Sequence, residues 1–367
     1  MSFNITLLII EEGEAMQITI YSGCLSLVRR SGVGQAILHQ KAMLERVGID
    51  VSDRWTEASS AIHINTIFPD SLMAAWLARR QHRKVIYYGH STMEDFQNSF
   101  KGSNLLAPLF KNWIIRCYEL SDFVITPTLY SKRLLESYGI KKPIYALSNG
   151  IDTGFFAPSQ ERGMVFREKY QLGKSDKVII SVGHYIERKG LLDFVELARR
   201  MPRVRFFWFG YTDLNLVPKG IRMAIQNAPE NLSFPGYVER DELRDAYCGC
   251  DLFVFLSNEE TEGIVVLEAL ACGIPTLVRD IPVYDDWLTD EKNIYKAKSL
   301  REFEEKANAI LTGALPDITE SGMEIAQGRS LEAVGERLIQ IYQRENILSP
   351  VYLQENSSLE PGDMINL

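Results

Sequence analysis

Short apolar runs of strand length alternate with helix-length segments along the whole of this chain. In the first half the runs are QITIYSG, AIHIN, KVIYYGH and FVITPT, and in the second half KVIISVG, RFFWFG, DLFVFLS and TLVRD. Helical patterns between and after them include Leu191–Arg200 and Leu331–Arg344. Apolar strands that alternate with helices form parallel sheets covered on both faces. The pattern restarts after segment 144–158, so it predicts an α/β protein with two Rossmann-like, doubly wound parallel-sheet domains.

The 367 residues leave room for both domains and their linkers. We expect an N-terminal domain over residues 16–150, a C-terminal domain over 151–327, a closing helix within 328–348 and a loose tail over 349–367. Residues 1–15 precede a second methionine and are interpreted as a non-native extension. Two such domains in tandem place the carboxyl ends of their strands across a central cleft, where ligands bind.

The composition excludes several classes of protein. No run reaches the roughly 18 apolar residues of a membrane-spanning helix. The five cysteines are scattered without a CxxC pair, which argues against a zinc site or a disulfide framework and favours a reducing compartment, the cytoplasm. We also expect no metal cofactor. The net charge of −8 and the absence of a known nucleic-acid motif argue against a nucleic-acid partner.

Positive charge is concentrated in the first half in spite of the negative total. Residues 16–150 hold 16 Lys and Arg against 10 Asp and Glu, and residues 71–145 hold 11 against 5. Segment 100–116 mixes cations with Trp, Phe and Leu, which suits a helix lying in an anionic membrane surface. A helix packed on the domain core would show the same apolar stripe. The residues expected to face the membrane are Lys101, Phe110, Lys111, Trp113 and Arg116.

Two loops of the second half have the composition of nucleotide-binding loops. In residues 181–190 (SVGHYIERKG), Gly183 lets the backbone approach a phosphate, and Arg188 and Lys189 supply positive charge at the start of a helix. A solvated basic turn would look similar. Residues 234–238 (FPGYV) form a strand end with a glycine bend that can wall a nucleobase, although an ordinary loop is the simpler interpretation.

Two glutamates follow the strand DLFVFLS at a fixed spacing. Glu260 falls at the strand-to-helix turn, and Glu268 lies inside the apolar run IVVLEALA. Carboxylates accept hydrogen bonds from the hydroxyl groups of sugar and ribose. An unpaired charge inside an apolar helix is costly, so a ligand-binding role is favoured over a solvated one for Glu268.

Together these motifs resemble the retaining glycosyltransferases of family 4, which have the GT-B fold. The E-x7-E spacing of Glu260 and Glu268, SGVG at 31–34, SNGID at 148–152, the glycine loop ending in Lys189-Gly190, and EALACGIP occur in the order of that family. The start VRRSGVGQAILHQKAML and the segment YYGHSTMEDFQNSF further resemble the glycolipid synthases of Gram-positive bacteria, especially those that make diglycosyldiacylglycerol.

The resemblance implies roles for particular residues. His90, Glu260 and Lys189 would be catalytic, with His90 facing the reacting sugar carbon. The residues implied in binding the sugar donor are Gly32, Gly34, Gly183, Arg188, Lys189, Gly236, Tyr237, Val238, Glu260, Gly263, Ile264 and Glu268. Two positions depart from the family. His184 stands where many relatives have arginine, and Glu262 stands where many have an aromatic residue, which predicts a more polar sugar pocket.

The implied activity is transfer of glucose or galactose, with retention, from UDP-glucose or UDP-galactose to a diacylglycerol-based glycolipid. Monoglucosyldiacylglycerol is the expected acceptor and diglycosyldiacylglycerol the product. The enzyme would act in the cytoplasm, peripherally on the inner face of the cell membrane. Alternatives are a family 4 enzyme with a soluble, polysaccharide or protein-glycan acceptor, and a nucleotide-sugar-binding protein without turnover.

Overall fold

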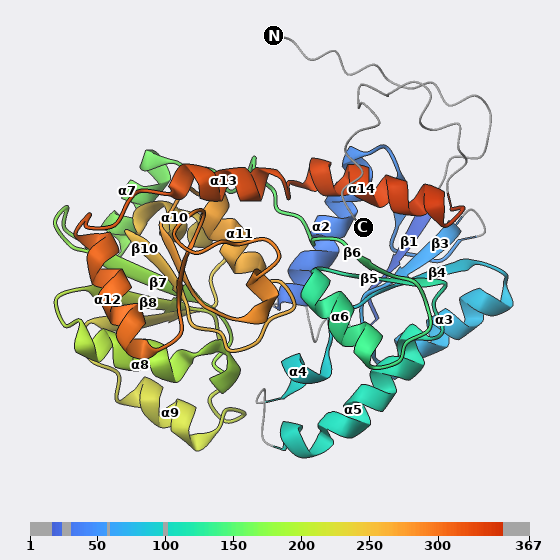
Figure 1. Ribbon diagram of the computed structural model, residues 1–367, viewed down its shortest axis with the longest axis horizontal. Helices are drawn as coiled ribbons and strands as arrows, with labels where there is room; N and C mark the ends of the chain where they lie inside the picture. The colour runs from blue at the N-terminus through green and yellow to red at the C-terminus, as the bar shows by residue number, and fades with distance from the viewer. Residues whose placement is uncertain (1–16, 24–30, 57–58, 98–101, 348–367) are drawn as a thin grey trace, which may run out of the picture.

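The computed structural model describes residues 17–23, 31–56, 59–97 and 102–347, and shows two α/β halves side by side (Figure 1). Each half is built on a sheet of six strands, and every strand pairing within the two sheets is parallel. Both strand orders are those of doubly wound sheets, as the alternating pattern predicts. The proposed extension 1–15 and tail 349–367 lie outside the described residues.

The N-terminal sheet has the strand order β2-β1-β3-β4-β5-β6. Its strands are β1 (Gln17–Tyr21), β2 (Asp50–Ser52), β3 (Ser59–Ile64), β4 (Lys84–Tyr88), β5 (Phe123–Thr126) and β6 (Ile144–Ala146). The four residues of β5, FVIT, are all buried because helices cover both faces of the sheet, which is why the strand is apolar without alternation.

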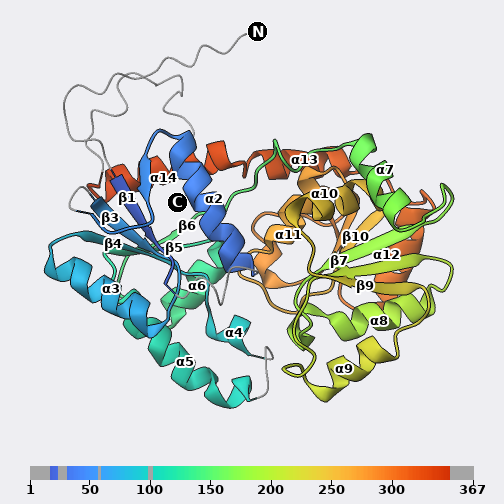
Figure 2. The ribbon, with the colours of Figure 1, turned by 180° about the vertical axis from the view of Figure 1, so that it is seen from behind.

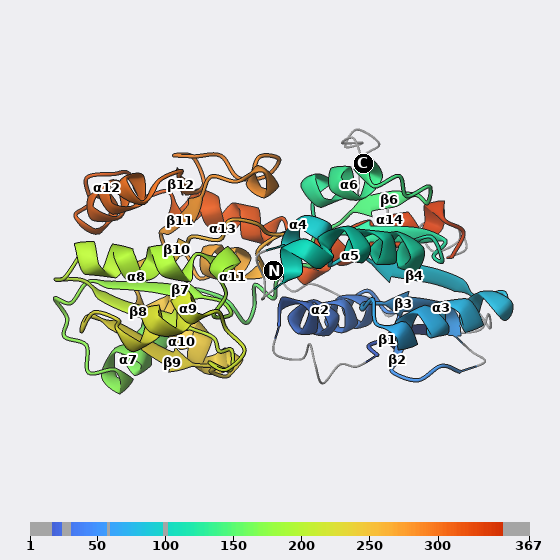
Figure 3. The same cartoon turned by 90° about the horizontal axis from the view of Figure 1, so that it is seen from below.

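Two layers of helices enclose this sheet. The helices that precede residue 140 are α2 (Gly32–Arg46), α3 (Pro69–Arg80), α4 (Met93–Phe96), α5 (Ser103–Tyr118) and α6 (Leu129–Ser137). Side chains of α2 pack on one face, and side chains of α3, α5 and α6 pack on the other. The short α4 lies at the side of the half that faces the C-terminal half (Figure 3).

The C-terminal sheet has the strand order β12-β11-β10-β7-β8-β9. Its strands are β7 (Val178–Val182), β8 (Arg205–Phe209), β9 (Leu232–Gly236), β10 (Leu252–Phe255), β11 (Thr276–Arg279) and β12 (Tyr295–Ala297). As in the first half, the central strands are continuous apolar runs, and all four residues of β10 are buried.

Helices also cover both faces of the C-terminal sheet. They are α7 (Gln160–Lys169), η1 (Glu187–Lys189), α8 (Leu191–Arg200), α9 (Lys219–Gln226), α10 (Arg240–Gly249), α11 (Ile264–Ala271), η2 (Pro282–Tyr284), α12 (Leu300–Leu311) and α13 (Thr319–Gln327). Side chains of α7, α10, α11 and α13 pack on one face, and those of α8, α9 and α12 on the other.

The last described helix, α14 (Leu331–Arg344), returns to the N-terminal half. Its apolar side, which includes Val334, Leu338 and Ile341, packs with α2 over the N-terminal sheet, and Figure 2 shows the two helices from behind. The two crossings of the chain between the halves are paired with each other, because Ile151 and Ser330 form a parallel bridge. The first half is therefore completed by residues from the end of the second.

Candidate active site

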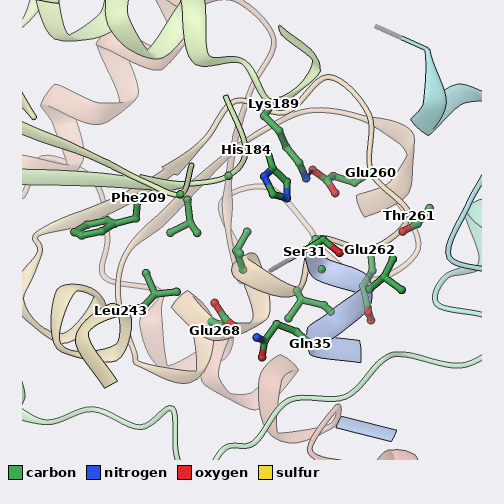
Figure 4. A pocket seen from close by; sticks show the side chains of 18 of the residues that line it. Ser31, Gln35, His184, Lys189, Phe209, Leu243, Glu260, Thr261, Glu262 and Glu268 are labelled. Carbon is green, nitrogen blue, oxygen red and sulfur yellow. Dashed lines mark hydrogen bonds and ion pairs between the residues drawn. The ribbon is translucent and has the colours of Figure 1, made fainter. Parts of the chain in front are cut away.

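A cavity of about 290 Å³ lies between the two halves (Figure 4). Its walls are the start of α2, the loop after β4 and α4 in the N-terminal half, and the loops after β7, β8, β9 and β10 in the C-terminal half. These are the carboxyl ends of the central strands, where doubly wound sheets bind their ligands. The predicted residues that line it are Gly32, His90, Gly183, Arg188, Lys189, Tyr237, Val238, Glu260, Gly263, Ile264 and Glu268.

Two predicted donor-binding residues are outside the lining of this cavity. Gly34 is buried within α2. Gly236 ends β9 in the left-handed conformation, with φ of +84°, and turns the chain toward the lining residues Tyr237 and Val238. The roles proposed for the lining residues stay predictions, but the structure brings these residues together from segments far apart in the sequence.

The loop between β7 and α8 presents two cations to the cavity. Gly190 ends it with φ of +76°, and a Cβ atom there would lie 2.2 Å from the carbonyl oxygen of Leu256. Only glycine fits this close approach, which brings the beginning of α8 against the end of β10. Arg188 and Lys189 immediately precede that helix N-terminus, so fixed positive charge and free N–H groups face the same space.

Lys189 and Glu260 form an ion pair at the wall of the cavity, and Figure 4 shows the ends of the two side chains next to each other. Arg188 lies behind them, 3.9 Å from the same carboxylate, and Nη1 of Arg188 donates to the carbonyl oxygen of Glu259 at 2.6 Å. Burial acts to raise the pKa of Glu260, but the adjacent Lys189 and Arg188 outweigh it and hold the pKa below its ordinary value. Glu260 is therefore an ionised acceptor for hydroxyl groups.

Glu268 also lines the cavity and lies on the second turn of α11. It is buried, and its Oε2 accepts a hydrogen bond of 2.9 Å from the hydroxyl of Tyr247. Burial raises the pKa of Glu268 to about 7. Figure 4 shows its carboxylate on the opposite side of the cavity from the Lys189–Glu260 pair. One end of the cavity thus holds the cations Lys189 and Arg188 with their paired carboxylates, and Glu268 is a separate carboxylate. Such cations can bind a diphosphate, and carboxylates can accept hydrogen bonds from the hydroxyl groups of a sugar.

Glu262 has a different environment from the one its position in the family suggests. Its carboxylate accepts hydrogen bonds from the hydroxyl of Ser148 and from the backbone N–H and side-chain amide of Asn149, the latter two at 3.1 and 2.7 Å. The residue lines the cavity but is only 1% exposed. The carboxylate of Glu262 therefore binds the interdomain linker, and its hydrogen bonds connect the two halves.

His184, the other departure from the family, offers no positive charge. Its Nδ1 lies 3.1 Å from the carbonyl oxygen of Tyr211, and burial lowers the pKa of the imidazole. The neutral ring lines the cavity near Lys189 (Figure 4). Cationic charge on this loop therefore comes from Arg188 and Lys189.

The N-terminal wall contains residues that the sequence did not single out. Asp95, on α4, forms a 2.8 Å ion pair with Nη1 of Arg188 and so joins the wall to the cationic loop. Gln35 and Asp95 both line the cavity. Both lie in segments that resemble the glycolipid synthases, VRRSGVGQAILHQKAML and YYGHSTMEDFQNSF, but the sequence predicted a role for neither residue. His90 lies at the end of β4, and burial lowers the pKa of its ring to about 4.

The segment expected to face a membrane forms α5, but its aromatic residues point inward. Phe110 stacks on Phe96 with ring centroids 3.9 Å apart, and the indole of Trp113 donates to the carbonyl oxygen of Ile67 at 2.6 Å. Lys111 lies over the ring of Tyr138. Arg116 is exposed, and Lys101 lies outside the described residues.

A different set of apolar side chains is exposed on α3 and α5, and we call it the α3/α5 apolar surface. Its residues are Met73, Trp76, Leu77, Leu105, Leu106 and Leu109. Leu105 and Leu109 are 84% and 68% exposed. The cations Arg79, Arg80 and Arg116 on the same two helices are also exposed. Within the described ranges, no helix is both long and apolar enough to cross a bilayer.

The described residues include no group of three His, Cys, Asp or Glu side chains that could hold a metal ion. The expectation that the reaction needs no metal stays a prediction. The cavity offers Arg188 and Lys189 beside a helix N-terminus, together with carboxylates that can accept hydrogen bonds from hydroxyl groups, which is the class of site expected for a glycosyltransferase.

Comparisons with known proteins agree with this class. A family model described as "Glycosyltransferase Family 4" matches residues 54–155, and one described as "Glycosyl transferases group 1" matches residues 165–321. The chain is similar to HepE of Anabaena, solved in complex with UDP and glucose, with a TM-score of 0.72 at 16% identity over 90% of this chain and all of that one. Sucrose-phosphate synthase of Thermosynechococcus elongatus gives a TM-score of 0.74 at 16% identity, over 91% and 100%.

Two curated relatives cover nearly the whole chain. The processive diacylglycerol alpha-glucosyltransferase of Acholeplasma laidlawii is 40% identical over 89% of this chain and 98% of its own length. The alpha-galactosylglucosyldiacylglycerol synthase of Streptococcus pneumoniae is 26% identical, over 92% and 90%. The chain belongs to glycosyltransferase family 4, with the GT-B fold, and within it to the group that includes the diacylglycerol glycosyltransferases. Both the fold and the resemblance expected from the sequence are confirmed.

Proposed function

We propose that the protein transfers a hexose, glucose or galactose, from a UDP-sugar to a diacylglycerol-based glycolipid, with retention at the anomeric carbon. The observation that carries the proposal is the 40% identity to a diacylglycerol glucosyltransferase over most of both chains, combined with a cavity that Arg188 and Lys189 line beside a helix N-terminus. Monoglucosyldiacylglycerol is the proposed acceptor. Retention is supported by the alpha products that the names of both relatives specify, because the donor sugar is itself α-linked.

In this proposal the charges of the cavity act on the leaving group and on the sugar. Lys189, Arg188 and the N-terminus of α8 stabilise the negative charge that grows on the diphosphate as the sugar bond breaks. Glu260, kept ionised by the two cations, accepts hydrogen bonds from hydroxyl groups of the donor sugar. Glu268 holds the ribose. The departing phosphate takes the proton of the acceptor hydroxyl, so the reaction uses the cations of the protein in place of a metal ion.

The acceptor is reached from a membrane surface in this proposal. The α3/α5 apolar surface, with the cations on the same two helices, has the composition of a segment that lies at the boundary between headgroups and acyl chains. The protein would therefore bind peripherally to anionic membranes. A family 4 enzyme with a soluble acceptor is the second candidate, and failure to bind anionic vesicles would favour it.

Product analysis by mass and linkage tests the proposal. Purified protein is incubated with UDP-glucose or UDP-galactose and with vesicles that contain anionic lipid and either diacylglycerol or monoglucosyldiacylglycerol. A dihexosyl lipid made from one donor is the expected product. Hydrolysis of the donor without a lipid product would contradict the acceptor and keep the donor site.

Lys189→Ala and Glu260→Ala connect this activity to the cavity. We expect each to lower turnover at least about tenfold, equivalent to ~1.4 kcal/mol of transition-state stabilisation. The matched control is Lys219→Ala, which removes an exposed lysine at the start of α9, away from the cavity. Near-normal turnover in both cavity variants would refute the site.

A further inference from the structure

Three buried polar side chains form a hydrogen-bonded row behind the N-terminal wall of the cavity. Gln40 comes from α2, Asn65 follows β3, and His90 follows β4. They are 0%, 3% and 8% exposed. Neighbouring parallel strands β3 and β4 bring Asn65 and His90 to the same edge of the sheet, and α2 packs over that edge. Three sequence segments therefore converge behind a ring that faces the cavity.

The side chain of Asn65 is fixed from one side by Gln40. Nε2 of Gln40 donates to Oδ1 of Asn65 at 2.7 Å, and Nδ2 of Asn65 donates back to Oε1 of Gln40 at 3.0 Å. The amide group of Asn65 cannot rotate about the Cβ–Cγ bond unless both hydrogen bonds break or Gln40 rotates with it. Buried amides that exchange two hydrogen bonds in this way are held in a defined orientation.

The fixed amide presents an acceptor to the imidazole of His90. Oδ1 of Asn65 lies 3.0 Å from Nε2 of His90, so a ring that keeps this bond carries its hydrogen on Nε2. The ring also stacks on Tyr88, with centroids 5.9 Å apart. Within the described residues Nδ1 of His90 has no hydrogen-bond partner, while the residue lines the cavity. The lone pair of Nδ1 is then the part of the ring left for a ligand.

The residues packed around His90 in the core of the N-terminal half carry no charge, so the ring stays neutral. Burial alone lowers its pKa to about 4. Behind Tyr88 lie His63 and Tyr342, whose own pKa values are moved by burial toward the uncharged forms. The charged groups that line the same cavity belong to α4 and to the C-terminal half: they are Asp95, Arg188, Lys189, Arg240, Glu260, Glu262 and Glu268.

We propose that Asn65 is a positioning residue for the transfer reaction: it holds His90 in the Nε2–H form so that Nδ1 accepts a hydrogen bond from a hydroxyl group of the bound sugar. This inference rests on the proposed function, because it takes a sugar as the ligand of the cavity. Gln40 supports the arrangement by holding the amide of Asn65. The sequence predicted a role for neither residue, although Gln40 lies within VRRSGVGQAILHQKAML and Asn65 ends the run AIHIN.

Asn65→Asp tests the proposal through the pH profile. The substitution keeps an oxygen next to Nε2 and adds a negative charge, which raises the pKa of His90. Below the raised pKa, Nδ1 carries a proton and cannot accept. We expect kcat of the variant to be about tenfold lower at pH 6 than at pH 8, and below the wild-type value at both, because aspartate cannot donate to Oε1 of Gln40. The wild-type protein should show no such loss between these two pH values.

The control is Asn65→Leu, which removes the acceptor without adding charge. It should lower kcat to a similar degree at both pH values and leave the Kd for UDP unchanged within about twofold, since UDP is assigned to the C-terminal half. Equal losses at pH 6 and pH 8 in Asn65→Asp, or wild-type activity throughout, would overturn the proposal. Thermal unfolding of both variants identifies any loss of folded protein.

A second readout is independent of activity, and so separates this inference from the proposed function. Ring-nitrogen chemical shifts of His90, assigned with a His90→Gln variant, report which nitrogen carries the hydrogen. The wild-type protein should show the Nε2–H form at pH 7. An Nδ1–H form would refute the role of Asn65, whatever product the enzyme makes.

Discussion

The buried carboxylate of Glu268 lowers the stability of the folded protein. An ionised group inside an apolar helix loses its hydration, and here the hydroxyl of Tyr247 replaces only a part of it. Burial therefore raises the pKa of Glu268 from 4.5 to about 7. Because the folded state holds the proton more tightly than the unfolded state, this residue makes folding less favourable as the pH rises from 4.5 to about 7.

Glu268→Gln should consequently stabilise the protein while weakening its function. Glutamine keeps an acceptor for Tyr247 but carries no charge. At pH 8 we expect the thermal unfolding midpoint to rise by about 2 °C or more, and at pH 5 we expect little change, because Glu268 is then protonated in the folded state. The Kd for UDP should increase, measured by titration calorimetry.

The control for this prediction is Glu336→Gln, which alters an exposed glutamate on α14. It should change neither the midpoint nor the Kd. A Glu268→Gln variant less stable than wild type at pH 8 would contradict the account of its buried charge.

The sequence predicts residues of this site unequally well. Glu268 can be recognised because a charge interrupts the apolar run IVVLEALA, and Lys189 because it ends a glycine loop before a helix. Asn65, directly after a strand, and Asp95, on the short helix α4, carry no such signal, since isolated polar residues at such places are common. Their places at the site depend on contacts with Gln40 and Arg188 respectively, which lie elsewhere in the chain and meet them only after folding.

For individual helices, the local sequence predicts where the helix begins and ends, but not the surface on which it packs. The helical periodicity gives the bounds of α8 and α14, Leu191–Arg200 and Leu331–Arg344, as the structure has them. It does not tell which surface α14 covers. On α5 the apolar stripe could serve the core or a membrane, and the structure shows that the aromatic residues serve the core while leucines are exposed.

The leucines of α5 allow a test of membrane binding at the level of this helix. We expect the double variant Leu105→Ser/Leu109→Ser to bind anionic vesicles roughly tenfold more weakly in a sedimentation assay, because two apolar side chains no longer enter the headgroup boundary. Thermal unfolding should not change, since both residues are exposed.

A matched control is Leu216→Ser, a leucine that is 72% exposed in the C-terminal half. Vesicle binding should be unaffected by it. If the double variant bound vesicles like the wild type, the α3/α5 apolar surface would not be the membrane contact.

At the scale of the whole molecule, the loop that carries Glu260 also connects the two halves. Thr128 of the N-terminal half donates to the carbonyl oxygen of Thr261 at 2.9 Å, and Ser148 and Asn149 donate to Glu262. A surface ion pair of 2.7 Å between Arg133 and Asp286 joins the halves further out. The loop that carries Glu260 and Glu262 is thus fixed to both sides of the cleft.

Glu262→Gln should separate donor binding from turnover. A glutamine cannot accept all three hydrogen bonds, because its amide group opposes the donors of Asn149. The orientation of the halves then becomes less defined. We expect kcat to fall about tenfold while the Kd for UDP changes little, because the cations that hold the diphosphate stay in place. Turnover assays and calorimetry measure the two quantities.

Thr261→Ser is the control for that variant, since it keeps the backbone carbonyl that Thr128 contacts and should leave both values unchanged. A Glu262→Gln variant that lost UDP affinity in proportion to kcat would show that Glu262 acts on the donor directly.

The return of α14 to the N-terminal half has a consequence for the order in which this protein is made. A chain grows from its N-terminus, and domains commonly fold as they emerge from the ribosome. Here Leu338 and Ile341 complete the core under α2, so that core stays open until residues near 345 have been synthesised. The half that is translated first is therefore the half that finishes folding last. During synthesis its exposed apolar face on α2 is the surface that a chaperone would bind.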